Sequence, residues 1–332
     1  MTFQIPTFCR QIRQSAKSAL DFLRVLLYHT GKKGAIGMQA FFETVGERIS
    51  IIFLVILTFF SSFQGQLFPQ ETIYPTAEGE TRVMSFNIRF NEFFQRRTLV
   101  PKLIKQYYPD SVGLQECTYQ WMYTFRELLP EYGLVGIGRD TGTQEPDCGE
   151  MNAILYRLDK YELIDSGTFW LSETPDVPSK GWDANDNRIC TWAVLEERET
   201  GRRYAHVNTH LDNIGETARG NGLALVIEKA LSFDLPVVLT GDFNFVESTP
   251  FMQQLRDSGL IYTKEAATQE TASGFTFHDY APEKVFSQSP IDYIWVNGAV
   301  AEVRSYQIIR DKLNNRFVSD HYPIYSDLIL EY

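Results

Sequence analysis

The sequence predicts an α/β protein in which β-sheets pack face to face and helices lie outside them. The chain has 332 residues, of which 44% are hydrophobic and 22% are charged, a composition typical of folded globular proteins. Short apolar runs with strand character are mixed with helical patterns, without the strict alternation of a barrel or a doubly wound sheet. No internal repeat or low-complexity linker interrupts the last 250 residues or so, about the size of one layered domain.

The first 66 residues differ from the rest of the chain. Residues 1–48 carry seven basic and three acidic side chains, a net charge of +4, and residues 49–66 carry no charge. The strongly apolar part is about 12 residues long, which is short for a membrane span of roughly 20. A basic flank, a short apolar run and small polar residues beyond it are typical of an export signal or a membrane anchor.

We therefore expect an exported protein, periplasmic or extracellular, and favour a cleaved signal over permanent membrane anchoring by residues 49–63. Met38 is an alternative start that would give a signal of ordinary length, and a buried core helix is the remaining interpretation of this segment. Residues 67–81 are expected to form a linker and residues 82–332 the folded domain. The whole chain carries a net charge of −11, which leaves −15 on the residues from 67 onward. That charge argues against non-specific binding of a nucleic-acid backbone.

Strands and helices are predicted along the body from the period of the apolar residues and from the turn residues between them. The expected strands are residues 82–88, 110–115, 153–156, 161–164, 189–195, 203–209, 235–240, 291–296 and 322–330. The expected helices are residues 99–107, 119–129, 217–231 and 251–257, and Gly259 suits the C-terminal cap of the last one. The charged turn at 199–201 predicts that the strands on either side of it form a hairpin.

Polar side chains gather at the boundaries of these strands. They are Asn87, Glu116, His210, Asp212, Asp242, Asn244, Asp292, Asp320 and His321. One such residue is routine, because polar residues commonly end strands and occupy loops. Six such boundaries together predict a shared site, because burying this many Asp, Glu, Asn and His side chains costs free energy unless a cation or a substrate offsets it.

The residue types narrow the chemistry of that site. Carboxylate and amide oxygens without thiolates favour Mg²⁺, Mn²⁺ or Ca²⁺, and the four cysteines lack the CxxC spacing of a zinc cage. A hard cation with carboxylates and two histidines suits phosphoryl chemistry, because the charged transition state needs positive charge and hydrogen-bond donors. No Gly-x-x-x-x-Gly-Lys loop is present, so P-loop nucleotide binding is not supported.

Six short motifs form a series along the chain. In chain order they are SFNIR (85–89), LQE (114–116), THLD (209–212), GDFN (241–244), IDYI (291–294) and SDHYP (319–323). The series resembles that of the endonuclease/exonuclease/phosphatase superfamily, with its deoxyribonuclease-like fold, and in particular its bacterial metal-dependent hydrolases. The resemblance covers residues 82–330. It implies a four-layer α/β sandwich of two stacked, mostly antiparallel sheets flanked by helices, and a divalent-metal-dependent phosphoesterase that hydrolyses a phosphodiester or a phosphomonoester.

The resemblance also implies a metal site. Glu116 would be the principal carboxylate for Mg²⁺ or Mn²⁺, with Asn87 and Asp320 completing the shell directly or through water. One position departs from the pattern, because Arg89 stands where many members carry an acidic residue. The exchange removes a possible metal carboxylate, so we expect one principal ion.

The remaining motif residues would handle the phosphate and the proton. Asp242 would orient or deprotonate the attacking water, and Asn244 and His210 would hold non-bridging phosphate oxygens. His321 would act as acid or base or stabilise the phosphoryl oxygens, with Asp292 fixing its ring through the other nitrogen. The sequence is compatible with water activation by either Asp242 or His321.

The expected partner is a phosphate ester that is small, lipid-linked or part of a nucleic acid. His210 is the variant of the phosphatase-like, sphingomyelinase-like and deadenylase-like branches. We expect a monomer that contacts a membrane only if its N-terminal segment is uncleaved. An exported nuclease acting on RNA or DNA is one alternative, for which a basic strip would partly offset the acidic body: Arg89, Arg96, Arg97 and Lys102. A catalytically silent binding module is another, and the six intact motifs argue against it.

Four other side chains have more than one interpretation. Arg188 either reaches a phosphate or forms a surface salt bridge. Phe275 and Phe277 either pack in the core, which we favour, or line the substrate cleft, where aromatic rings could stack on a base or a sugar. His278 is expected at the edge of the cleft.

Overall fold

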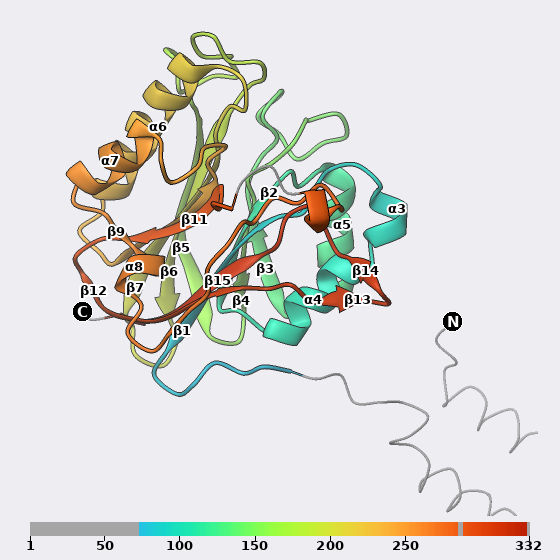
Figure 1. Cartoon of the computed structure of the whole chain (residues 1–332), viewed down its shortest axis with the longest axis vertical. Helices are drawn as coiled ribbons and strands as arrows, with labels where there is room; N and C mark the ends of the chain where they lie inside the picture. The colour runs from blue at the N-terminus through green and yellow to red at the C-terminus, as the bar shows by residue number, and fades with distance from the viewer. Residues whose placement is uncertain (1–72, 285–287, 331–332) are drawn as a thin grey trace, which may run out of the picture. The chain divides into compact units, whose positions relative to one another are not determined.

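Two β-sheets stack on each other in the computed structural model, which describes residues 73–284 and 288–330 (Figure 1). The first sheet has seven strands in the order β10-β12-β15-β1-β2-β4-β3, and the second has six in the order β5-β6-β7-β8-β11-β9. Three of the pairings are parallel, β1 with β2, β7 with β8 and β10 with β12, and the other pairings in the two sheets are antiparallel. The predicted sandwich of mostly antiparallel sheets is confirmed.

The elements have the following bounds. The first sheet contains β1 (Thr81–Asn87), β2 (Ser111–Gln115), β3 (Tyr132–Val135), β4 (Ile154–Arg157), β10 (Glu270–Thr271), β12 (Val300–Ile308) and β15 (Ile324–Leu330). The second contains β5 (Tyr161–Trp170), β6 (Ile189–Glu197), β7 (Arg203–His210), β8 (Val237–Asp242), β9 (Ile261–Tyr262) and β11 (Asp292–Val296). A separate two-stranded ribbon pairs β13 (Lys312–Leu313) with β14 (Arg316–Phe317). The helices are α3 (Phe93–Arg96), α4 (Leu99–Tyr107), α5 (Tyr119–Leu128), α6 (Glu216–Leu231), α7 (Pro250–Asp257) and α8 (Thr263–Ala266), with a 3₁₀ turn at Pro282–Lys284.

Helices cover the outer faces of both sheets (Figure 1). Successive side chains of β1 alternate between faces, so Val83 joins the core between the sheets while Met84 and Phe86 pack toward α4 and α5. On the far side, α6 and α7 pack their apolar faces on the second sheet. These four layers place both sheets in the interior, which is why β1, β2 and β8 are buried along their whole length.

Part of the contact between the sheets is polar. His206 on β7 lies 2.9 Å from Ser111 Oγ through Nδ1 and 2.9 Å from Thr240 Oγ1 through Nε2. Nearby, Gln115 donates to Asn208 Oδ1 at 2.7 Å. Gly113 lies under this group, where an added Cβ would come within 2.0 Å of Thr240 Oγ1. Directional hydrogen bonds between His206 and Ser111 and between Gln115 and Asn208 therefore join the two sheets.

Acid is expected to weaken the fold through His206. Burial lowers the pKa of this ring to about 3, whereas an unfolded histidine titrates near pH 6.5. Between those values the unfolded chain binds a proton that the folded chain does not, so stability falls as the pH drops below about 6.5. From pH 7 to pH 5 the loss from this group is about 2 kcal/mol. Urea unfolding at both pH values should show it, and His206→Asn should reduce the pH dependence; an unchanged dependence would contradict the assignment.

The structure also differs from the predicted elements. Strands β3 and β12 were not predicted, and β5 runs to Trp170 where only residues 161–164 were expected. The last strand begins at Ile324 and not at residue 322. Residues 73–80 contain no helix or strand. The predicted signal or anchor (1–66) and the first part of the predicted linker lie outside the described residues. Among the residues described, none of the helices is long and apolar enough to cross a bilayer.

Candidate active site

The ends of five strands bring the predicted site residues together. In the second sheet, the parallel register pairs His210 with Asp242 and the antiparallel register pairs Asp292 with Asp242, so these three residues lie side by side. In the first sheet Asn87 pairs with Gln115, which places Glu116 next to it. Asn87 Nδ2 donates to Asp242 Oδ2 at 3.0 Å and so joins the two sheets at the site.

Oxygen ligands gather on the side of the first sheet. Asn87 Nδ2 also donates to Glu116 Oε1 at 3.0 Å, and Glu116 Oε2 accepts the backbone N–H of Phe90 at 2.9 Å. Asp320 lies close by, because Ser319 Oγ donates both to the Asn87 carbonyl at 2.7 Å and to Asp320 Oδ1 at 3.1 Å. Two carboxylates and an amide, with no thiolate among them, are the donor chemistry of a hard divalent cation.

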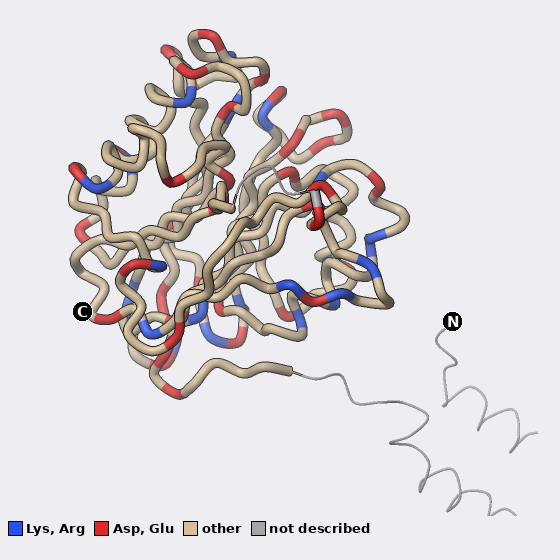
Figure 2. The backbone as a smooth tube through the Cα atoms, in the orientation of Figure 1, with Lys and Arg blue, Asp and Glu red and all other residues tan. Residues whose placement is uncertain are grey.

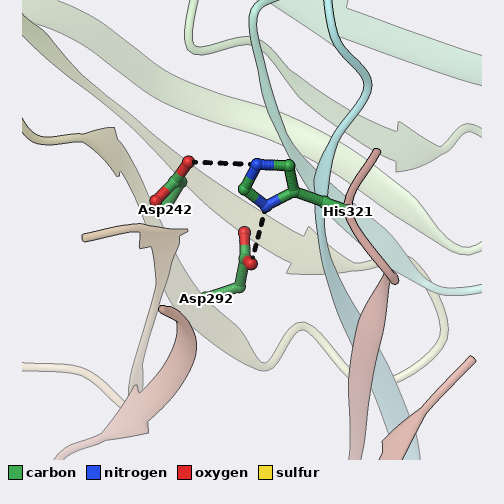
Figure 3. A group of neighbouring side chains, drawn as sticks. All are labelled: Asp242, Asp292 and His321. Carbon is green, nitrogen blue, oxygen red and sulfur yellow. Dashed lines mark hydrogen bonds and ion pairs between the residues drawn. The ribbon is translucent and has the colours of Figure 1, made fainter. Parts of the chain in front are cut away.

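His321 lies between two carboxylates of the second sheet (Figure 3). Its Nδ1 is 2.9 Å from Asp292 Oδ2, and its Nε2 is 3.8 Å from Asp242 Oδ2. One ligand atom from each of the three residues lies within 4.8 Å of the others, so the three groups are close enough together to share a cation. Because Asp292 occupies Nδ1, however, the ring is oriented with Nε2 toward Asp242, which is the arrangement of a proton-handling histidine.

Burial and neighbouring charges shift the pKa values of this cluster. Burial, reinforced by the charge of Asp292, raises the pKa of Asp242 to about 7. Burial alone would lower the pKa of His321, but Asp292 and Asp242 outweigh it and raise that pKa to about 10. Burial holds the pKa of His210 well below its usual range, and Arg188 and Arg139 add to this effect. The two site histidines therefore differ in charge at neutral pH.

Backbone strain also concentrates here. Arg89, Glu116 and Asn244 adopt φ angles of 55°, 60° and 53°, in the left-handed region that residues with a Cβ rarely occupy. Such conformations cost of order 1–3 kcal/mol each and are found where function requires a particular side-chain direction. Three of them beside one pocket are consistent with a functional site.

The two predicted phosphate-holding residues line the same pocket. His210 Nε2 is 3.4 Å from Asp242 Oδ2. The Asn244 amide donates one N–H to the Leu211 carbonyl at 3.0 Å, and its backbone N–H donates to Asp242 Oδ1 at 3.0 Å. All eight predicted site residues thus lie at one end of the sandwich, and Asp212 does not join them. Its carboxylate instead accepts the backbone N–H groups of Ile214 and Gly215 in its own loop and of Asn185 in the β5–β6 connection.

Arg89 makes contacts that its position in the motif did not reveal. Its NH1 lies 2.5 Å from Asp320 Oδ2 and 3.5 Å from Asp279 Oδ1, and its guanidinium carbon lies 5.2 Å from the ring centroid of Tyr280. A fixed positive charge therefore neutralises one of the predicted metal carboxylates.

The pocket also contains residues that the sequence did not single out. Arg139 and Glu150 line it together with Arg188, and the cavity measures about 380 Å³. Burial raises the pKa of Glu150 to about 7, with Arg139 opposing and Glu116 reinforcing the shift. Acidic and basic residues both occur along the loops of the backbone (Figure 2). Arg188 is buried and pairs with Asp212 at 3.2 Å, so the surface salt bridge considered for it is excluded.

Three expectations about neighbouring residues were wrong. Phe277 is 38% exposed and lines the pocket, whereas core packing was expected. His278 was expected at the cleft edge but is buried against Phe317 and Tyr322. The basic strip is not continuous: Arg97 and Lys102 are exposed, but Arg96 is buried and donates to the carbonyls of Ile88, Arg89, Asn91 and Val318.

Fold and site together define the class: the protein is an α/β sandwich of two stacked sheets, with a carboxylate–histidine cluster at one end. A model of the Endonuclease/Exonuclease/phosphatase family matches residues 84–321. The chain belongs to this family.

Several solved structures are similar. An endonuclease/exonuclease/phosphatase family protein of Bacteroides thetaiotaomicron is 34% identical, with a TM-score of 0.71, and the match covers 78% of this chain and 100% of that one. A mannosyl-6-phosphatase of the same species is also 34% identical, with a TM-score of 0.68, covering 75% of this chain and 100% of that one. A curated relative, uncharacterised protein L388 of Acanthamoeba polyphaga mimivirus, is 30% identical over 173 residues, which are 48% of this chain and 63% of the relative.

Proposed function

We propose that this protein is a divalent-metal-dependent phosphoesterase. The observation that carries the proposal is that Glu116 and Asp320 line one pocket together with Asp242 and His321. Asn87 and Asp292 lie directly behind them, bonded to Asp242 and His321 respectively. Glu116, Asn87 and Asp320 would hold Mg²⁺ or Mn²⁺. When bound, such an ion supplies charge neutralisation to the phosphoryl oxygens and acidifies bound water.

The residues of the chain itself would perform the remaining steps. Asp242 lies centrally, within 3.0 Å of Asn87 and 3.8 Å of His321, and is placed to orient the attacking water and accept its proton. His321 would donate from Nε2 to the phosphoryl oxygens, with Asp292 holding its ring. His210 and Asn244 would position the non-bridging oxygens. The new bond joins the water oxygen to phosphorus, and the ester P–O bond breaks as the leaving alcohol takes a proton.

A substrate panel at neutral pH tests this function. Nitrophenyl phosphate, bis-nitrophenyl phosphate, single-stranded RNA, plasmid DNA, sphingomyelin and an inositol phosphate are each incubated with Mg²⁺ or Mn²⁺, with and without chelator. We expect chelator-sensitive hydrolysis of at least one small ester, and its loss in Glu116→Ala. Turnover of nucleic acid alone would support the exported nuclease, and no chelator-sensitive turnover of any substrate would contradict an enzymatic role.

We expect about one Mn²⁺ per chain, measured by isothermal titration calorimetry. Arg89 NH1 lies 2.5 Å from Asp320 Oδ2 and neutralises that carboxylate. The positive charge of Arg89 would also repel a second cation bound beside Asp320. Arg89→Asp, which places an acidic residue at that position, is expected to add a second and weaker site. Two ions of similar affinity in the unaltered protein would contradict the single-metal assignment.

We also propose that the uncharged segment at 49–66 directs export. Cell fractionation combined with the intact mass of the recovered protein tests this. A protein found in the cytoplasm at full length would contradict it.

A further inference from the structure

A continuous polar surface lines the pocket beside the residues that would act on the phosphate. Its members come from the β3–β4, β5–β6 and β7–α6 connections. Arg139 donates to Glu150 Oε2 at 3.1 Å and lies 3.5 Å from Asp186 Oδ1. Arg188 donates to Asn213 Oδ1 at 3.2 Å and lies 4.0 Å from Asp186 Oδ2. We call these five side chains the polar wall.

The polar wall, together with the adjacent Asp212, has no excess of positive charge. Arg188 Nε also donates to Asp212 Oδ2 at 3.2 Å, so two guanidinium groups face three carboxylates. Even with Glu150 protonated, carboxylates and guanidiniums match one for one. The wall therefore has no surplus positive charge for a second phosphate group or for a nucleic-acid backbone. Hydroxyl groups suit it better, because each hydroxyl donates one hydrogen bond and accepts others.

Two aromatic rings complete the pocket. Phe90 is 44% exposed and Phe277 is 38% exposed, and both line the same cavity as the polar wall. Ligand pockets generally combine apolar ring surface with a few placed polar groups that orient the ligand. A ligand ring with C–H groups on its faces and hydroxyl groups at its edge fits such a pocket, because the faces can pack on the aromatic rings while the hydroxyls bond to the polar wall.

We propose that the polar wall binds the leaving group of the substrate, and that the substrate is a monophosphate ester of a neutral, hydroxyl-rich ring, a sugar or a cyclitol. The inference rests on the proposed function, because the phosphoryl group must lie at Asp242 and His321. Water supplies a hydroxyl to phosphorus and a proton to the ester oxygen, so the products are the free polyol and inorganic phosphate. The pocket thus selects the alcohol by its hydroxyls while the catalytic residues act on the phosphate.

The test compares esters that differ in their hydroxyls. Mannose 6-phosphate, glucose 6-phosphate and myo-inositol 1-phosphate carry them, and nitrophenyl phosphate has none. In Asp186→Ala, we expect the fall in kcat/KM for the ring esters to exceed that for nitrophenyl phosphate by about tenfold, mainly through KM, because hydrogen bonds to charged groups are lost. Asp176→Ala, an exposed aspartate in the same connection outside the pocket lining, is the matched control and should change neither.

A double variant guards against misfolding. Arg139→Gln with Glu150→Gln removes both charges of one partly buried pair together, so that neither of these two residues is left charged without the other. It should show the same selective loss as Asp186→Ala. An equal loss for every ester, or a preference of the unaltered protein for fructose 1,6-bisphosphate over the monophosphates, would overturn the inference and leave the phosphoesterase function standing.

Binding is measured separately from turnover. Mannose 6-phosphate is titrated into the Mn²⁺-loaded His321→Asn protein, with and without Asp186→Ala. Binding at least about fivefold weaker in the double variant supports the polar wall as a ligand site even if no ester is hydrolysed. Equal affinities in the two proteins would overturn it.

Discussion

His321→Asn is expected to lower kcat for the best ester of the substrate panel by about 10²–10⁴-fold, the range typical of a lost acid–base group. The His321 ring is the group between Asp292 and Asp242 at the junction of the two sheets. Asparagine keeps a polar side chain of similar reach but cannot move a proton. Steady-state kinetics measure the loss, and calorimetry should show that the affinity for Mn²⁺ is unchanged.

His278→Asn provides the matched control. This histidine is also buried and neighbours the site, but it packs on Phe317 and Tyr322 and does not line the pocket. Its replacement should leave kcat within a few fold of the unaltered protein. If His321→Asn retained full activity, or if both variants lost activity equally, the role given to His321 would be wrong.

Glu116→Gln is expected to weaken Mn²⁺ binding by about 100-fold or more, because even partners of metal ligands typically contribute 10–100-fold. Glutamine keeps the size of the side chain, and its single oxygen can still accept from either Asn87 or the Phe90 N–H, which bond to different oxygens of Glu116. The change therefore removes charge with little effect on packing. Calorimetry measures the affinity, and activity should recover in part as the Mn²⁺ concentration is raised.

Glu127→Gln on the exposed face of α5 controls for the general effect of removing one acidic charge. It should leave the Mn²⁺ affinity unchanged. An unchanged affinity in Glu116→Gln would show that the cation binds elsewhere, and the Asp242–Asp292–His321 cluster would then be the first alternative to examine.

The site was predictable because its residues lie at strand boundaries, where apolar runs stop at a polar residue. Registers such as His210 with Asp242 and Asp292 with Asp242 then bring those boundaries together in space. Arg139 and Glu150 gave no comparable signal. They lie in the long connection between β3 and β4, and only the tertiary fold brings them to the pocket.

The missed strands have physical reasons as well. Strand β12 contains register shifts at two places, between Val300 and Glu302 and between Val303 and Ser305, which interrupt the alternation of apolar and polar residues. Strand β5 lies at the edge of its sheet, where the polar residues Asp165 and Ser166 are tolerated because that edge faces solvent. The sequence pattern therefore predicted the central strands of the sheets better than the strands at or near their edges.

The hydrogen bonds that join the two sheets, His206 with Ser111 and Gln115 with Asn208, have a consequence for catalysis. Glu116 and Asn87 belong to one sheet, whereas Asp242 and Asp292 belong to the other. Purely apolar packing would allow the two sheets to slide slightly against each other, whereas hydrogen bonds, which depend on direction, do not. The relative position of the site residues on the two sheets is therefore fixed by interior side chains that do not contact the substrate. Gly113→Ala, whose added Cβ would clash with Thr240 on the other sheet, would therefore impair turnover by displacing the site residues of one sheet relative to those of the other.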